Sequence, residues 1–146
     1  MLKEITEFLN SSDHRATKAE RIAEAIRLGS GYRWVGIYDV GEQEIAVIAW
    51  SGKGAPAYPR FPLKQGLSGH AVATRSTVVS NDVTNDPRYL TAFGSTQSEI
   101  IVPVIDMDIN KVLGTLDVES EAKNAFTDAD VRKLEEYARA MLPLWK

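Results

Sequence analysis

Two pairs of apolar, β-branched segments constrain the fold of this chain more than any other feature of its sequence. The first pair is YRWVGIYDV at 32–40 and EIAVIAW at 44–50, joined by the short polar connector GEQ. The second pair is EIIVPVID at 99–106 and KVLGTLDVES at 111–120, joined by MDIN. Strand-forming segments on either side of a short polar connector are typical of β-hairpins. The sequence therefore predicts two antiparallel hairpins far apart along the chain.

Helical patterns lie before the first hairpin and after the second. Apolar residues recur at helical spacing in residues 1–10 and again from about Thr17 to Leu28, so residues 1–30 are predicted to form N-terminal helices. A C-terminal helix is predicted over 127–142, where FTDAD offers a capping-box start. Between the hairpins, RFPL and STVVS are short extended pieces around a short helix in LSGHAVATR. Paired strands with flanking helices predict the α+β class, with an antiparallel sheet covered by helices.

Length and composition limit the domain count and the classes of partner. A chain of 146 residues without an internal repeat is predicted to form a single domain, residues 1–146. It carries 17 Lys and Arg against 20 Asp and Glu, mixed along the chain, for a net charge of −3. Nucleic-acid recognition needs clustered Lys and Arg on one face, so we expect no nucleic-acid partner.

The chain has no cysteine and two histidines. The missing thiols exclude disulfides and thiolate metal sites, and we predict neither a metal centre nor a bound cofactor. The sequence contains no apolar run of bilayer-spanning length and no signal-peptide pattern. We therefore expect no membrane partner, and the absence of cysteine fits a cytoplasmic protein.

Three acids in the second hairpin are predicted to converge. If the turn centres near Ile109, antiparallel pairing brings Glu99 opposite Glu119, with Asp117 on the same face and diagonal to Glu99. Like charges directly opposite each other are destabilising unless a positive group lies among them. The candidates are a ligand ammonium, a divalent cation, Arg60 or Arg88. Alternatively, Glu99 and Glu119 end their strands and point into water.

The remaining candidates for a binding site are aromatic or lie in loops. Tyr38 and Trp50 lie in the first hairpin, and their polar tips need a hydrogen-bonding partner when buried. Gly36 leaves room between the rings of Trp34 and Tyr38, which we interpret as a pocket wall. Residues 81–98 form a long polar segment, and long loops in compact domains are usually functional or mobile.

In chain order, the segments GLSGHAVATRSTVVSNDV, SEIIVPV, VLGTLDVES and FTDADVRKLEEYA resemble the landmarks of GAF domains. The resemblance runs from about Tyr32 to the C-terminus. It implies a GAF-like antiparallel sheet of about six strands between helical layers, α/β/α. It also implies a domain that binds a small molecule and dimerises through terminal helices, so we expect a homodimer formed through residues 1–10. The alternative is that this helix folds back onto its own sheet.

Within this family, the chain most resembles the free methionine-(R)-sulfoxide reductase group of short GAF proteins. These carry SEI before an apolar strand and a GVLDIDS-like strand after it, which correspond here to Ser98-Glu99-Ile100 and to GTLDVES at 114–120. The resemblance implies that Glu99, Asp117 and Glu119 hold the ligand. Glu119 stands where an Asp is usual in the group.

The cysteines of that group are missing from this chain. Its G-x-C-G motif reads Gly66-Leu67-Ser68-Gly69 here, and its nucleophile would fall among Thr91, Ala92 and Phe93. A serine hydroxyl is a far poorer nucleophile toward sulfur and cannot form the disulfide that completes a thiol cycle. We therefore expect a protein that is not an enzyme.

The function predicted from the sequence is sensing or carrying a small cationic or amino-acid-like ligand. The alternatives are a relative of the reductase that is inactive by the thiol route, and a dimerising scaffold without a ligand. The predicted ligand-binding residues are Glu99, Asp117, Glu119, Tyr38, Trp50, Tyr89, Phe93 and Ser68.

Overall fold

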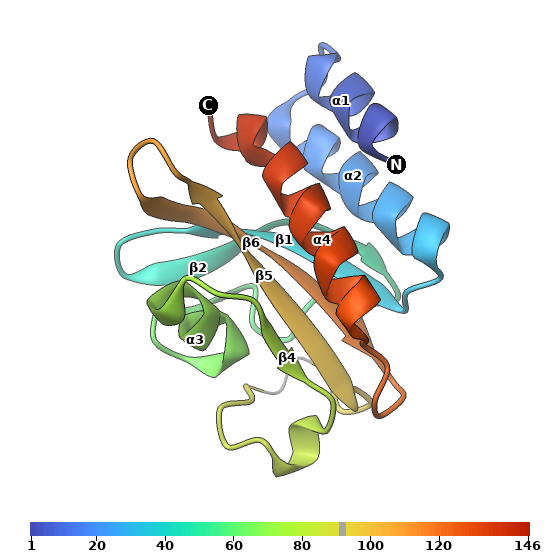
Figure 1. Cartoon of the computed structure of the whole chain (residues 1–146), viewed down its shortest axis with the longest axis vertical. Helices are drawn as coiled ribbons and strands as arrows, with labels where there is room; N and C mark the ends of the chain where they lie inside the picture. The colour runs from blue at the N-terminus through green and yellow to red at the C-terminus, as the bar shows by residue number, and fades with distance from the viewer. Residues whose placement is uncertain (91–92) are drawn as a thin grey trace.

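The fold is built on one six-stranded sheet, shown in Figure 1, in a computed structural model that describes residues 1–90 and 93–146. The strand order is β3-β2-β1-β6-β5-β4, and every neighbouring pair is antiparallel. The strands are β1 Trp34–Val40, β2 Glu44–Gly52, β3 Arg60–Pro62, β4 Val78–Ser80, β5 Ser98–Asp106 and β6 Lys111–Ser120. Both predicted hairpins and the predicted α+β class are confirmed.

Helices cover both faces of the sheet (Figure 1). One face carries α1 Leu2–Asn10, α2 Arg15–Ser30 and α4 Asp128–Ala140, and the other carries α3 Gly66–Thr74. Alternation along β1 divides the core accordingly. Val35 and Ile37 pack in the cluster that contains the α2 and α4 residues, whereas Trp34 and Tyr38 pack in a separate cluster on the α3 side. The predicted helical layers on both sides of the sheet are therefore confirmed.

The C-terminal helix is shorter than predicted. It ends at Ala140 and is followed by the 3₁₀ helix η2 Leu142–Trp145, and a second 3₁₀ turn, η1 Val83–Asn85, lies between β4 and β5. Pro143 lies in the first turn of η2, where its missing N–H needs no partner. The predicted capping box is present, because the Thr127 hydroxyl accepts from the backbone of Asp130 and the Asp130 carboxylate accepts from the backbone of Thr127.

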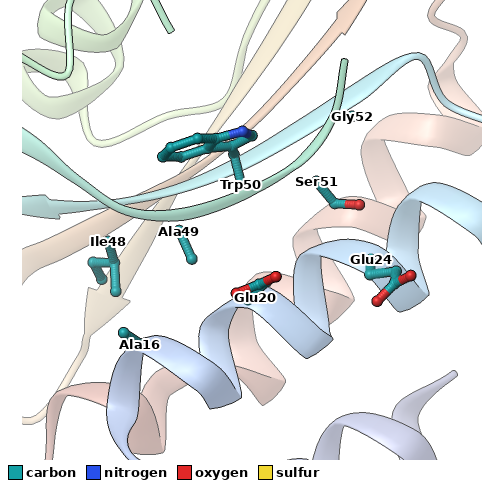
Figure 2. A pocket seen from close by; sticks show the side chains of 8 residues that line it. All are labelled: Ala16, Glu20, Glu24, Ile48, Ala49, Trp50, Ser51 and Gly52. Carbon is teal, nitrogen blue, oxygen red and sulfur yellow. The ribbon is translucent and has the colours of Figure 1, made fainter. Parts of the chain in front are cut away.

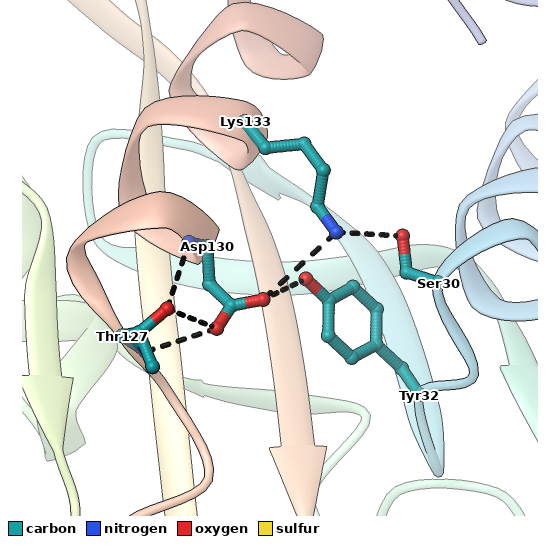
Figure 3. Close-up of polar contacts among 5 residues, drawn as sticks. All are labelled: Ser30, Tyr32, Thr127, Asp130 and Lys133. Carbon is teal, nitrogen blue, oxygen red and sulfur yellow. Dashed lines mark hydrogen bonds and ion pairs between the residues drawn. The ribbon is translucent and has the colours of Figure 1, made fainter.

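A polar network ties the end of α2 to the start of α4 (Figure 3). The Tyr32 hydroxyl donates to Asp130 at 2.7 Å, and the Lys133 ammonium donates to the Ser30 hydroxyl at 3.0 Å. The Lys133 ammonium also lies 5.1 Å from the centre of the Tyr32 ring. These contacts fix the entry into β1, which lies at the centre of the sheet beside β6.

The first helix folds back onto its own chain. It packs against α2 and α4, and its Ile5 side chain is fully buried there. The homodimer through residues 1–10 stays a prediction. Among the described residues, none of the helices combines the length and apolar character needed to cross a lipid bilayer.

Candidate functional site

The three predicted acids lie together on one face of the central strands. Glu99 pairs with Glu119 across β5 and β6, and Asp117 lies two residues before Glu119 on the same face. Their side chains are only 5%, 4% and 1% exposed for Glu99, Asp117 and Glu119. The predicted register is confirmed. The alternative in which Glu99 and Glu119 end their strands in water is wrong, because the α3 side of the sheet is covered.

These carboxylates, called the acidic row below, lack enough hydrogen-bonding partners. Glu99 and Asp117 share a side-chain hydrogen bond, which requires a proton on one of the two carboxyls. The Thr96 hydroxyl donates to Glu119 Oε1 at 2.9 Å. Glu99 Oε2, Asp117 Oδ1 and Glu119 Oε2 are buried and have no partner within the described part of the chain. Such orphaned polar atoms are rare in native structures, because each costs about 1–3 kcal/mol.

Neither predicted arginine compensates the acidic row. Arg60 pairs with Glu44 at 2.6 Å, and Arg88 pairs with Asp86 at 2.7 Å. Both predictions are therefore wrong, because each guanidinium finds a carboxylate close to it on the surface. The nearby cation is Arg33, which lowers the pKa of Glu119 but itself pairs with Glu121 at 2.7 Å.

Burial raises the pKa of every acid in the row. Loss of hydration is the largest cause for Glu99 and Asp117, and repulsion from the neighbouring acids adds to it, so both pKa values lie well above normal. Burial also raises the pKa of Glu119 to about 7, although Thr96 and Arg33 oppose the shift. The Tyr38 hydroxyl has a raised pKa for the same reasons, burial first and then the three acids. Near neutral pH the ligand-free row therefore holds protons.

The pH dependence of stability follows from the raised pKa of Glu119. An unfolded Glu titrates near 4.5, so its favourable contribution is fully present below that pH and is lost as pH rises through about 7. Thermal unfolding of the ligand-free protein should show a lower melting temperature at pH 8.5 than at pH 5.5. Between these two pH values the raised pKa of Glu119 should lower the free energy of unfolding by roughly 2 kcal/mol.

The control for this prediction is Glu119→Gln, which removes this titrating group and should make the profile less steep between pH 5.5 and 8.5. Acids with lowered pKa values, such as Asp86 and Asp130, are ionised across this whole pH range and do not contribute to the slope. A wild-type melting temperature that is equal or higher at pH 8.5 would contradict a protonated row.

A small cavity lies against the acidic row and encloses about 30 Å³. Its walls come from β1, the loop before β3, β3 itself, the start of α3 and the 81–98 segment. The lining residues are Tyr38, Pro56, Tyr58, Phe61, Gly66, Leu90, Glu99 and Asp117. The Tyr38 and Phe61 rings meet edge to face with their centres 6.1 Å apart. The site thus combines buried acids at its base with an aromatic and apolar wall.

A second recess of about 10 Å³ lies on the other side of Glu119. It brings two cationic side chains, Arg33 and Lys53, to the same end of the acidic row. Phe93 and Trp34 form its apolar side, with their ring centres 5.4 Å apart. The acidic row therefore has an apolar cavity on one side and a partly cationic recess on the other.

The structure separates the other predicted binding residues. Tyr38 lines the first cavity and Phe93 the second recess. Tyr89 packs on the cluster around Leu67, and its neighbour Leu90 is the residue that lines the cavity. Ser68 is buried on α3 outside both linings, and Trp50 lies at the sheet edge, 36% exposed. As ligand contacts, all of these remain predictions.

Several lining residues were absent from the prediction. Pro56, Tyr58 and Phe61 belong to the Gly- and Pro-rich segment after the first hairpin, where aromatic residues in a loop were the available signal. Arg33 and Lys53 carried no signal, because nothing in their sequence context distinguishes them from solvated surface cations. The predicted room beside Gly36 does not exist. A Cβ there would lie 2.4 Å from the Trp34 ring and 2.9 Å from the Tyr38 ring, so the rings fill that space.

The position of the missing nucleophile is only partly described. Thr91 and Ala92 lie outside the described residues, and Phe93 packs against Trp34. In the rest of the chain, no group of three His, Cys, Asp or Glu side chains is arranged to hold a metal ion.

Comparison with known proteins identifies relatives of this chain. It is 31% identical over 107 residues to the free methionine-R-sulfoxide reductase of Saccharomyces cerevisiae, covering 73% of this chain and 59% of that protein, less than two thirds of its length. The type II free methionine-R-sulfoxide reductase of Thermoplasma acidophilum superimposes with a TM-score of 0.83 at 30% identity, covering 96% of this chain and 94% of that one. The enzyme of Neisseria meningitidis, solved with its substrate, gives a TM-score of 0.87 at 26% identity and covers 99% of this chain and 85% of that one.

These relatives correct the expectation that the protein is not an enzyme. That expectation rested on the missing cysteines, but the relatives in sequence and in structure are reductases. The absence of cysteine excludes a thiol nucleophile and does not exclude other catalytic groups.

The family follows from the fold and from the match to a family model. The antiparallel sheet has α2 and α4 on one face and α3 on the other, and three buried acids lie on the α3 face of β5 and β6. A model of the GAF domain matches residues 19–141, which is most of the chain. Domains of this kind commonly bind small molecules. The chain belongs to the GAF domain family.

Proposed function

We propose that this chain binds a free amino acid of the methionine sulfoxide class, with the ligand's ammonium group on the acidic row. The observation that carries the proposal is the trio of buried carboxylate oxygens without partners, on Glu99, Asp117 and Glu119. An ammonium group has three N–H donors and one positive charge. It would supply both the missing hydrogen bonds and the missing countercharge.

The second recess supports a zwitterionic ligand. Arg33 and Lys53 lie at the Glu119 end of the row, so a carboxylate attached close to the ammonium would meet them there. Arg33 is held by Glu121 at 2.7 Å, which fixes its guanidinium beside the recess. A free α-amino acid carries both charges on neighbouring atoms. A peptide-bonded residue carries neither.

The first cavity supports an apolar side chain. Its wall is formed by Tyr38, Phe61 and Leu90, next to Glu99 and Asp117. Its present volume of about 30 Å³ is that of one water molecule, so binding requires the Leu90 side chain to move outward. That movement would report binding in a sensory role. The side-chain class is taken from the relatives named for methionine-R-sulfoxide.

Isothermal titration calorimetry with matched ligands tests the proposal. L-methionine-(R)-sulfoxide should bind. N-acetyl-methionine sulfoxide, which lacks the ammonium, and the methyl ester, which lacks the carboxylate, should each bind at least about 100-fold more weakly, because each leaves buried charges unpaired. Glu4→Gln, far from the cavity, is the matched protein control. Equal affinity for the acetylated compound would contradict an ammonium on the acidic row.

A mutation test isolates the carboxylate end. Lys53→Met removes a cation that forms no salt bridge within the described part of the chain. It should weaken binding of the free amino acid about tenfold and leave binding of the methyl ester unaffected. Methionine formed in the same samples, with a thiol added to the buffer, is measured separately, because binding and turnover are different properties. Mg²⁺ and Ca²⁺ are titrated in parallel, and tight binding of either would favour a cation site instead.

A further inference from the structure

The acidic row is almost closed to solvent, so its charge has to be balanced inside the protein when no ligand is bound. Glu99, Asp117 and Glu119 are buried, and one oxygen of each has no hydrogen-bonding partner within the described residues. The spaces beside them are the cavity of about 30 Å³ at Glu99 and Asp117 and the recess of about 10 Å³ at Glu119. Three ionised carboxylates in this place would repel one another with little screening.

The cations near the row do not supply the missing charge. Among the described residues that line the cavity and the recess, Arg33 and Lys53 are the cationic ones, and both lie at the Glu119 end. The Arg33 guanidinium already forms an ion pair with Glu121 at 2.7 Å, and the Lys53 side chain is exposed to water. The other end of the row, at Glu99 and Asp117, therefore has no countercharge.

The other elements packed around the row do not balance its charge either. Tyr38 of β1 stays neutral, because burial and the three acids raise its pKa. Asp86 in the 81–98 segment forms an ion pair with Arg88 at 2.7 Å and adds repulsion at Glu99. Further titratable residues of these elements are exposed or paired elsewhere, namely Tyr58, Arg60, Lys64, His70, Arg75 and Asp82.

Protons occupy the row in the ligand-free protein for these reasons. The hydrogen bond that Glu99 and Asp117 share needs a proton on one of the two carboxyls. At Glu119, burial raises the pKa to about 7, so this carboxyl is about half protonated at pH 7. A ligand group with a positive charge and several N–H donors would have to take the place of these protons.

Burial, and not the number of acids, distinguishes the row from other acids of the chain. Two glutamates, Glu20 and Glu24, line the groove of about 390 Å³ between α2 and β2 (Figure 2). Both side chains are exposed, so water can satisfy their oxygens and solvent ions can balance their charge. This exposed pair needs no bound proton, and it provides a matched control for the row.

We propose, on the basis of the proposed function, that ligand binding at the acidic row exchanges protons for the ligand's ammonium group. Each exchange breaks an O–H bond of a carboxyl and passes the proton to water or a buffer base. Hydrogen bonds from the ammonium N–H groups replace it, and no oxidation or reduction occurs. At pH 7 the release should be about half a proton from Glu119 and up to about one from the Glu99–Asp117 pair. Occupancy of the site then depends on pH, and acid conditions empty it.

Calorimetry in two buffers counts the released protons. L-methionine-(R)-sulfoxide is titrated into the full chain at pH 7 in phosphate and in Tris, whose enthalpies of ionisation differ strongly. The observed binding enthalpies should differ by the number of protons released multiplied by that difference. Affinity should also rise between pH 5.5 and 7.5, by about tenfold per pH unit for each proton released. The ammonium and carboxylate of the free amino acid keep their charges over this range.

Two variants and a spectroscopic measurement locate the exchange. Glu119→Gln removes one exchanging carboxyl, so it should bind more weakly and release about half a proton fewer at pH 7. Glu24→Gln in the groove of Figure 2 should release as many protons as the wild type. Infrared difference spectra of the wild-type chain need no variant. Ligand addition should remove the C=O band of a protonated carboxyl and add a carboxylate band.

The outcomes distinguish a failure of the exchange from a failure of the proposed function. Binding with equal enthalpies in the two buffers, or with net uptake of protons, would overturn the exchange and leave ligand binding intact. An equal loss of released protons in Glu24→Gln and Glu119→Gln would place the exchange outside the row and overturn it as well. An absence of binding at every pH from 5.5 to 7.5 would overturn the proposed function and the exchange together.

Discussion

Asp117→Asn should raise the melting temperature of the ligand-free protein at pH 8 and weaken binding of a free amino acid by at least about 100-fold. The side chain is 4% exposed and lies on the same face of the sheet as Glu99 and Glu119, two residues before Glu119 on β6. An amide of the same shape cannot ionise, and it adds two N–H donors from which the neighbouring carboxyl oxygens can accept hydrogen bonds. The gain in stability should be roughly 1–3 kcal/mol, because orphaned buried acceptors become satisfied.

The opposite signs of the two effects make this experiment informative. A residue kept for stability would lower the melting temperature when it is replaced, whereas a residue kept for a ligand lowers only the affinity. The matched control is Asp108→Asn in the exposed turn of the second hairpin, which should change neither quantity measurably. Thermal unfolding and calorimetry on the same samples separate the outcomes. Unchanged affinity in Asp117→Asn would remove the acidic row from the binding site.

Gly114→Ala should destabilise the protein by about 3 kcal/mol or more, since there is no space for a methyl group. A Cβ at this position of β6 would lie 2.1 Å from the Trp145 ring and 2.6 Å from the backbone oxygen of Tyr38. The ring cannot easily give way. Its Nε1 donates to Asp39 at 2.8 Å, and the Arg15 guanidinium lies 5.5 Å from its centre. The backbone oxygen belongs to β1, which pairs with β6.

Urea unfolding of Gly114→Ala and of a matched control measures the effect. The control is Gly94→Ala, where an added Cβ meets nothing within 4 Å. It should remain within about 0.5 kcal/mol of the wild type. If Gly114→Ala is equally mild, Trp145 does not pack against β6 as described. Gly114 lies near the start of β6, whereas Glu119 lies near its end. Ligand binding by a folded Gly114→Ala variant would therefore show whether the acidic row depends on packing at the start of the strand.

The sequence predicted the sheet and the acidic row because strand periodicity has a fixed period of two residues. Once the turn near Ile109 was placed, the pairing of Glu99 with Glu119 followed directly, and the structure confirms it. A bulge between Val104 and Ile105 lies between the turn and this pair and shifts the register by one residue, and nothing in the sequence predicted it. The short strands β3 and β4 were also visible as apolar pieces between turn residues.

The burial of the row and the choice of its neighbours could not be predicted in the same way. Whether a strand end is covered depends on loops packed from distant parts of the chain, such as those that bring Tyr58 and Leu90 to the cavity. Arg60 and Arg88 form ion pairs with Glu44 and Asp86 and not with the acidic row. A sequence pattern does not show which of several carboxylates an arginine will pair with. Trp50 of β2 pairs with Gly36 of β1. A bulge between Ile37 and Tyr38 separates this pair from Tyr38, the β1 residue that lines the cavity.

The pairing of β1 with β6 at the centre of the sheet has a consequence for how the protein reaches its native state. Trp34 pairs with Glu119, so most of the chain forms a loop between two strands that must meet. Closing a long loop costs conformational entropy before any contact repays it, and such distant contacts slow folding. The two hairpins can each form early, but the acidic row meets Tyr38 only when they join. Binding of the proposed ligand would therefore be a readout of complete folding, because a kinetic intermediate with both hairpins formed but unjoined would lack the proposed site.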